Sequence, residues 1–146
     1  MHTFLKMQGW EFVVASTIEQ QGLAINDPRV VAQITERFVA YDAALMANDV
    51  EKLCAFFWDS PLVIRYGTAE NLYGAEALRA FRETRSTKDL SRVVMRIVIT
   101  TFGQDFATAN AEYRTKELGR FGRQSQTWCR LPEGWRVVAA HVSLLP

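Results

Sequence analysis

The hydrophobic pattern of the chain changes near residue 90, and the two halves predict two kinds of structure. Before that point, apolar side chains recur every three or four residues, which is typical of amphipathic helices. Asn26-Asp27-Pro28 offers a capping side chain followed by a proline that needs no N–H partner in a first turn, so a helix is predicted to begin there. Shorter helices are predicted over Val50–Phe57 and Ala75–Arg85. The buried stripe of the first helix is predicted to contain Val31, Ile34, Phe38, Tyr41 and Leu45.

The second half of the chain alternates apolar and polar side chains, which predicts strands joined by hairpins. The predicted long strands are Ser91–Thr101, Phe106–Lys116, Arg123–Arg130 and Trp135–Leu144. In the first of them the alternation places Val93, Met95, Ile97 and Ile99 on one face and Arg92 and Arg96 on the other. A short strand, Leu62–Ile64, precedes them and runs into Arg65.

Helices followed by hairpin-linked strands indicate an α+β domain. We predict a cone, in which a curved, barrel-like antiparallel sheet packs on three N-terminal helices and encloses one small-molecule pocket. The domain is predicted to span residues 26–146. Residues 1–25 are predicted to be an extension, part helical, that lies against the domain. Because the first helix has its own start signal, deletion of this extension is expected to leave the fold intact.

Composition and motifs mainly exclude classes of function. With 17 basic and 16 acidic side chains in 146 residues, the chain lacks the basic excess typical of nucleic-acid or membrane-surface binding. No apolar run approaches the ~20 residues of a membrane span. Glycine-rich nucleotide loops and HExxH motifs are missing, so neither a cofactor nor a metal is expected. Cys54 and Cys129 are predicted to be free thiols, which favours a reducing, cytoplasmic location.

Two polar residues stand out in apolar surroundings. Tyr41 is the member of the first helical stripe that carries a hydroxyl, and Arg65 ends an apolar strand, where a charge must be paired, exposed or used. Together they suggest a site for a small anion. The alternatives are a buried hydroxyl bonded to backbone and a strand-end ion pair between Arg65 and Glu70. Other charged residues are predicted to be exposed: Arg82, Arg85, Arg92, Arg96, Asp42 and Asp59.

The last hairpin supplies a second group of candidates. If Arg130 pairs with Trp135 across the turn, regular antiparallel pairing puts four polar or aromatic side chains on one face. These are Gln124, Gln126, Trp128 and His141. This face either lines the cone or points outward as a dimer contact, and a shift of one residue in the pairing would exchange the two faces.

Several segments resemble those of a known family. They are Phe56-Phe57-Trp58, Arg65-Tyr66-Gly67 with Glu70–Gly74, Gly122–Trp128 and Gly134–Ser143. Across residues 26–144 the chain resembles the nuclear transport factor 2-like (SnoaL-like) superfamily. Within it, the chain resembles the AtzH-like family, which includes HpxZ-type proteins of oxalurate catabolism. Residues 1–25 have no counterpart in this pattern.

The resemblance implies a homodimeric cone that handles small N-carboxylated ureas or ureido acids without a metal, for example by decarboxylating dicarboxyurea. The family's proposed catalytic pair falls on Tyr41 and Arg65. Other residues of the matching segments and of the hairpin face are expected to bind substrate: Trp58, Asn71, Gln124, Gln126, Trp128 and His141.

Three functions fit the sequence. The first is a cofactor-free enzyme that acts on a small ureido carboxylate, by decarboxylation or hydrolysis or within oxalurate breakdown. The second is a non-catalytic protein that binds a small anion or assists a partner amidase. The third is an isomerase or cyclase, which would need a buried Asp or His base, and His141 is its only candidate.

Overall fold

The structure is a computed structural model that describes residues 2–146 and every side chain except those of residues 1–5 and 7. Within this range it contains three helices and ten strands. The helices are α1 (Pro28–Met46), α2 (Val50–Phe56) and α3 (Ala75–Thr84). The long strands are β7 (Arg92–Phe102), β8 (Phe106–Thr115), β9 (Phe121–Leu131) and β10 (Gly134–Leu144). The short strands are β1 (His2–Met7), β2 (Trp10–Ala15), β3 (Ile18–Gln20), β4 (Leu23–Ile25), β5 (Ile64–Tyr66) and β6 (Asn71–Tyr73).

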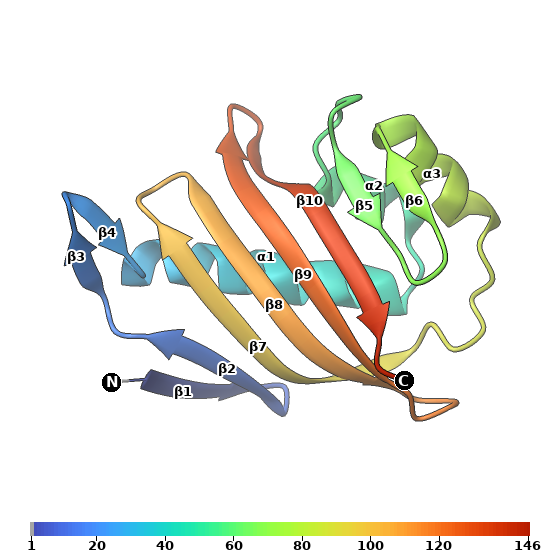
Figure 1. Cartoon of the computed structure of the whole chain (residues 1–146), viewed down its shortest axis with the longest axis horizontal. Coiled ribbons are helices and arrows are strands. Elements are labelled where there is room, and N and C mark those ends of the chain that lie inside the picture. The colour runs from blue at the N-terminus through green and yellow to red at the C-terminus, as the bar shows by residue number, and fades with distance from the viewer. Residues whose placement is uncertain (1) are drawn as a thin grey trace.

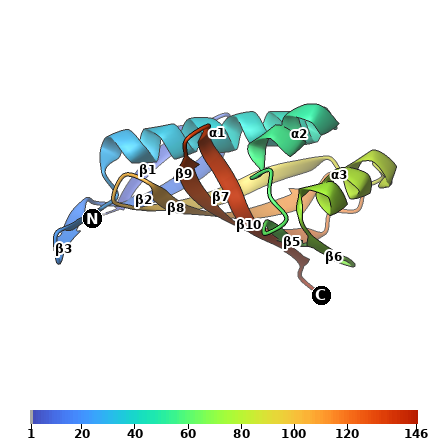
Figure 2. The same cartoon turned by 90° about the horizontal axis from the view of Figure 1, so that it is seen from above.

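The strands form one curved sheet that does not close into a barrel (Figure 1). Its main path runs β1-β2-β7-β8-β9-β10-β5-β6. The four long strands are antiparallel neighbours, as the alternating pattern predicted, whereas β2 and β5 join the edges of this group in parallel. Helices α1 and α2 lie as a layer over one face of the sheet, and α3 flanks it at the β5–β6 end (Figure 2). The α+β architecture predicted from the sequence is therefore confirmed.

Helix α1 begins where its capping signal placed it. The Asp27 carboxylate accepts a hydrogen bond from Arg29 N at 2.9 Å, and Pro28 occupies the first turn. Asn26 Oδ1 accepts from Thr101 N at 2.9 Å, which ties the start of the helix to β7. The buried face of α1 contains two polar side chains among apolar ones: Val30, Ile34, Phe38, Tyr41, Asp42, Ala44 and Leu45. Within the described chain, no helix is long and apolar enough to cross a membrane.

Two β-bulges put several side chains of the long strands on the face opposite to the predicted one. The pairing of β7 with β8 shifts between Val94 and Arg96. As a result Arg92 points into the core and is 6% exposed, while Val93 and Met95 are on the outer face, contrary to prediction. The bulged strand has one residue more than its partner, and this extra residue reverses the alternation beyond it.

The second bulge lies in β10. Trp135 pairs with Arg130 as predicted, but the register shifts between Val137 and Ala139. His141 consequently pairs with Ser125 rather than with Gln124. His141 is therefore on the exposed face of the sheet, opposite to the face predicted for it.

The segment before α1 is also different from the prediction. It contains four strands and no helix, and β2 pairs in parallel with β7. Phe12 is 1% exposed, and the ring of Trp10 meets that of Phe38 edge-on at 6.3 Å. This segment thus contributes side chains to the main core, and deletion of residues 1–25 would expose the rings that they cover.

We therefore expect truncation or core mutation of this segment to destabilise the domain. Phe12→Ala removes a fully buried ring and should lower the free energy of unfolding by about 3–5 kcal/mol. Ile18→Ala, in the same segment but 54% exposed, is the control and should change it little. Urea unfolding of both variants measures the difference, and equal stability of the two would contradict the placement of Phe12 in the core.

Candidate functional site

A cavity of about 340 Å³ opens beside the C-terminal half of α1 and is bounded by β5, α3, the loop after α3 and the ends of β8, β9 and β10. A cavity of this size fits a small metabolite. Its polar lining includes Tyr41, Arg65, Arg85, Arg92, Tyr113 and Gln124. The sequence singled out three of these, Tyr41, Arg65 and Gln124, and the structure brings them together at this cavity.

The Tyr41 hydroxyl sits at the inner wall of the cavity. The side chain is 2% exposed, and the rings of Phe56 and Phe57 pack against it with centroids at 5.8 and 6.4 Å. Gln124 Nε2 donates a hydrogen bond to Tyr41 Oη at 2.9 Å. The hydroxyl is thus the acceptor, so its own proton remains available to a ligand. Its partner is a side chain, not the backbone carbonyl considered as the alternative.

Gln124 provides a second unsatisfied polar atom at the same place. Its Oε1 is buried and has no hydrogen-bond partner in the described part of the chain. Buried polar groups are normally paired, because each unpaired one loses its hydrogen bonds to water. The Gln124 amide therefore presents one acceptor to whatever fills the cavity while its amino group holds Tyr41.

Arg65 reaches the cavity from β5, which β10 fixes by parallel pairing of Arg65 with Ala140. Its Nη1 donates to Glu70 Oε1 at 2.8 Å, and its side chain is 11% exposed. The strand-end ion pair considered from the sequence is present, and Arg65 lines the cavity as well. A Cβ at position 67 would overlap the Glu70 carboxylate. Gly67 therefore leaves the space in which Glu70 holds the guanidinium.

A buried ion pair forms the wall next to Tyr41, and the sequence did not predict it. Arg92 and Asp42 are joined by Nη2–Oδ1 and Nε–Oδ1 contacts of 2.9 Å, with side chains 4% and 6% exposed. Both had been predicted to be exposed. The Arg92 guanidinium also lies 4.8 Å from the ring centre of Tyr113, a cation–π distance. Burial raises the pKa of the Tyr113 phenol, which keeps it neutral near pH 7.

Helix α3 contributes two further arginines that had been predicted to be exposed. Arg82 is 3% exposed and stacks over Phe57 at 4.4 Å, and Arg85 lines the cavity. Burial lowers the pKa of both guanidinium groups, because it removes water from the charged form. An arginine nevertheless stays charged at neutral pH. Arg82 lines the neighbouring cavity, so Arg85 and Arg92 are the arginines that the structure adds to Arg65 among the residues singled out from the sequence.

The other predicted binding residues lie elsewhere. Trp128 is fully buried in the core and donates through Nε1 to Gln126 Oε1 at 3.1 Å. Both share the inner face of the sheet with Gln124, which settles the orientation of this hairpin face, but neither lines the cavity. Asn71 is exposed on β6, and Trp58 is partly buried after α2.

His141 is separated from the cavity by the sheet. Its ring packs edge-on against that of Tyr66 on the outer face, with centroids at 5.8 Å. The bulge in β10 is the cause of this placement. The isomerase or cyclase interpretation had His141 as its base, so it loses this candidate. Asp42 is buried nearby, but it is paired with Arg92 and does not line the cavity.

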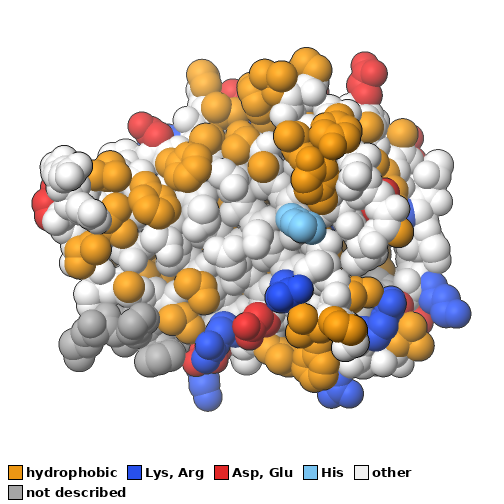
Figure 3. Space-filling view, viewed as in Figure 1, with side chains coloured by type: hydrophobic (Ala, Val, Ile, Leu, Met, Phe, Trp, Pro, Cys, Tyr) orange, Lys and Arg blue, Asp and Glu red, His pale blue; other side chains and the backbone are white. Residues whose placement is uncertain are grey.

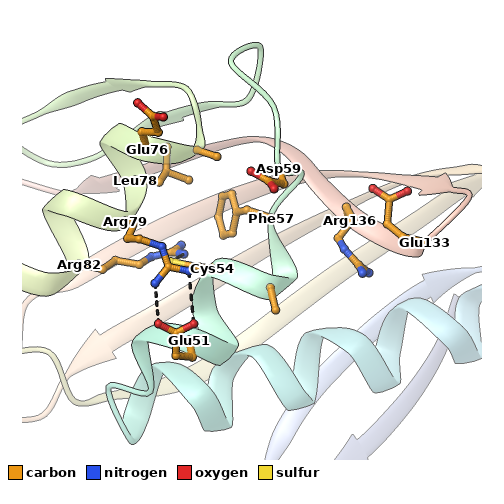
Figure 4. Close-up of a pocket in the computed structure, with 12 residues that line it drawn as sticks. Glu51, Cys54, Phe57, Asp59, Glu76, Leu78, Arg79, Arg82, Glu133 and Arg136 are labelled. Carbon is orange, nitrogen blue, oxygen red and sulfur yellow. Dashed lines mark hydrogen bonds and ion pairs between the residues drawn. The ribbon is translucent and has the colours of Figure 1, made fainter.

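A neighbouring cavity of about 550 Å³ lies between α2, α3 and the β9–β10 turn (Figure 4). Arg79 on its rim donates to Glu51 at 2.6 and 3.3 Å, while Arg82 lies deeper, with Nη1 3.8 Å from Cys54 Sγ. None of the predicted site residues lines this space.

Among the described residues, no group of three or more His, Cys, Asp or Glu side chains is arranged to hold a metal ion, and both cysteines are free.

Comparisons with known proteins agree with this fold. The sequence model of the AtzH-like family matches residues 23–146. Comparison with curated proteins finds no significant match. A crystal structure of a protein of unknown function from the DUF3225 family of Pectobacterium atrosepticum is 47% identical, with a TM-score of 0.81, over 84% of this chain and 95% of that one.

Two further solved structures are similar. A cystatin-like fold protein from Burkholderia xenovorans is 48% identical, with a TM-score of 0.80, over 86% of this chain and 100% of that one. An NTF2-like protein of unknown function from Pseudomonas putida is 18% identical, with a TM-score of 0.69, over 80% of this chain and 87% of that one, and this likeness shows the fold alone.

The buried ion pair gives a test of the site's framework. Asp42→Asn leaves the Arg92 charge in the core without its counter-ion, and it should lower the free energy of unfolding by about 3–5 kcal/mol. Glu51→Gln breaks the exposed pair with Arg79 and is the control, for which little change is expected. Urea unfolding at neutral pH measures both. A similar small effect of the two substitutions would contradict a structural role for the Asp42–Arg92 pair.

Proposed function

The chain belongs to the AtzH-like family, whose sequence model spans residues 23–146, and on this basis we propose that it is a cofactor-free enzyme acting on small ureido carboxylates. The proposed reaction removes CO₂ from an N-carboxyurea such as dicarboxyurea, or is a step in oxalurate breakdown. The single observation that carries this proposal is the hydrogen bond from Gln124 Nε2 to Tyr41 Oη. It leaves the tyrosine proton free in a cavity that Arg65 also lines.

Loss of CO₂ from such a substrate breaks the bond between the urea nitrogen and the carboxylate carbon. The electron pair of that bond returns to nitrogen, which must gain a proton for the amine to leave in neutral form. Tyr41 Oη supplies this proton as the general acid. Water then returns a proton to the tyrosinate, and the hydroxide that forms combines with CO₂ as bicarbonate, so atoms and charge balance.

The surroundings of Tyr41 favour this transfer. Arg82 and Arg85 are within electrostatic range of the Tyr41 oxygen, so a negative charge that develops there is stabilised. The aromatic rings around the phenol exclude water from its buried side. A carboxylate that leaves water loses hydration of its charge, which weakens its hold on that charge and favours release as neutral CO₂.

Arg65 is proposed to hold the part of the substrate that remains. Contact between a guanidinium and the departing carboxylate would stabilise the ground state and slow its release as CO₂. Contact with the carbonyl or the retained carboxylate orients the substrate without that penalty. Glu70 occupies Arg65 Nη1, so Nε and Nη2 are the atoms that remain for the substrate.

Substitutions of the two residues test the proposal. Tyr41→Phe keeps the ring and removes the proton, so turnover should fall roughly 100- to 10,000-fold while the protein stays folded. Arg65→Lys keeps the charge but loses the planar fork, so KM should rise more than kcat falls. The assay follows CO₂ and ammonia released from dicarboxyurea, oxalurate and allophanate.

Tyr66→Phe is the matched control, because Tyr66 is adjacent to Arg65 in sequence but packs on the outer face against Tyr73 and His141. It should retain wild-type turnover. Wild-type rates in both Tyr41→Phe and Arg65→Lys would refute the catalytic assignment. The protein would then be assigned to the alternative function, a small-anion binder that assists a partner amidase.

We also propose that the chain forms a homodimer through the outer face of its sheet. Figure 3 views this face and shows hydrophobic side chains spread over it. Exposed apolar side chains of three adjacent long strands lie there, namely Val93, Met95, Val98, Phe106 and Phe121. Such a surface is typical of a contact that excludes water between copies of one chain.

Light scattering at micromolar concentration should give the mass of two chains. Val98→Glu places a charge at the middle of the proposed contact and should shift the mass toward that of one chain. Ile18→Glu changes an exposed residue on β3, away from this face, and should leave the dimer intact. A monomeric wild-type mass would contradict the proposal.

A further inference from the structure

Helix α3 holds two cations next to each other that have no carboxylate partner within the described chain. Arg82 lies in the last turn of α3, and Arg85 is the extended residue that caps the C-terminal end of the helix. Neither forms an ion pair, whereas most other arginines near the cavity do. Burial lowers the pKa of both guanidinium groups, and the positive charge of Arg82 lowers the pKa of Arg85 further. Two desolvated like charges without a counter-ion are unfavourable unless an anion joins them.

Three of the four arginines that line the cavity form an ion pair with a carboxylate, and one does not. Arg65 pairs with Glu70 at 2.8 Å, Arg92 with Asp42 at 2.9 Å and Arg120 with Asp89 at 3.0 Å. Arg85 lines the same cavity, yet its one hydrogen bond to a side chain goes to the neutral amide of Asn48. Its Nε is buried and unpartnered among the residues described. Arg85 is therefore the arginine of this cavity that forms no ion pair among the described residues.

We infer that Arg85 receives a second anionic group of the ligand, so that the cavity selects small dianions over monoanions of the same size. This inference rests on the proposed function for the location of the site and adds a specificity-determining residue to it. Arg65 and Arg85 come from different elements, β5 and α3, and border one cavity. A ligand with an anionic group at each end satisfies both guanidiniums at once, whereas a monoanion leaves one of them unpaired. With dicarboxyurea, Arg65 holds the retained carboxylate and Arg85 the departing one, so the contact with Arg85 raises affinity at some cost in the rate of CO₂ release.

Asn48 acts as a positioning residue for Arg85. Its Oδ1 accepts from Arg85 Nη2 at 3.0 Å, which fixes the planar guanidinium at the cavity wall. Asn48 has a positive φ of 47°, a conformation that asparagine and glycine tolerate better than other residues. Asn48→Gly therefore keeps the backbone conformation and removes only the contact to Arg85, which makes it a specific test of positioning.

The test compares two ligands of nearly equal size that differ by one charge, malonate and its monoamide malonamate. Isothermal titration calorimetry of the full chain at pH 7 measures both dissociation constants. Wild-type protein should bind malonate at least about ten-fold more tightly than malonamate. Arg85→Gln should abolish this preference, Arg85→Lys should retain part of it, and Asn48→Gly should reduce it while malonamate binding stays unchanged.

Arg79→Gln is the matched control, because Arg79 is on the same helix but lines the neighbouring cavity and pairs with Glu51. It should bind both ligands as the wild type does. The inference is overturned if the wild type shows no preference, if malonate does not bind at millimolar concentration, or if Arg85→Gln keeps the preference.

Failure of the inference and failure of the proposed function give different results. If dianion preference depends on Arg85 but no ureido carboxylate is turned over, the inference stands and the enzymatic proposal fails. If ureido carboxylates are turned over by way of Tyr41 while selectivity ignores Arg85, the proposed function stands and this inference fails.

Discussion

The architecture of the site depends on one constraint: helix α1 buries two consecutive polar residues, Tyr41 and Asp42, beneath the sheet. Buried hydroxyl and carboxylate groups must find partners, because the water that would otherwise satisfy them is excluded. The sheet supplies Gln124 to Tyr41 and Arg92 to Asp42. Once these partners face inward, apolar side chains cannot fill that end of the sheet, and a polar cavity remains there.

The inward position of Arg92 could not be predicted from the sequence, whereas the helices and long strands could. The three helices, the four long strands and their order followed from periodicity and turn residues, because each is a local signal. Tyr41 and Arg65 were recognisable for the same reason, as polar residues within apolar runs. The bulges near Met95 and Val138 were not predictable, because one extra residue in a strand leaves the alternating pattern locally plausible on either face.

The charges of the site were hidden for a different reason. The chain as a whole is almost neutral, with 17 basic and 16 acidic side chains, so composition gave no sign of a positive cavity. On α3 the sequence pattern makes Arg82 and Arg85 look like part of a solvated face. Arg82 is buried because the ring of Phe57, which directly follows α2, covers its guanidinium. Arg85 is half-buried at the wall of the cavity. Tertiary packing, which a local pattern does not contain, therefore decides how much positive charge reaches the cavity.

Strand β9 sets how deep that charged cavity extends. Its inward side chains follow one another at two-residue steps as Gly122, Gln124, Gln126 and Trp128. A Cβ at Gly122 would overlap the Tyr113 ring, so glycine lets this phenol pack at the open end, beside the cavity. Gln124 then meets Tyr41, and Trp128, fully buried against Phe56, closes the far end. Since successive inward residues of a strand are about 7 Å apart, this short run spans the distance from open cavity to solid core. A change at any of these steps would therefore alter the volume available to a ligand, even where the residue does not touch the ligand.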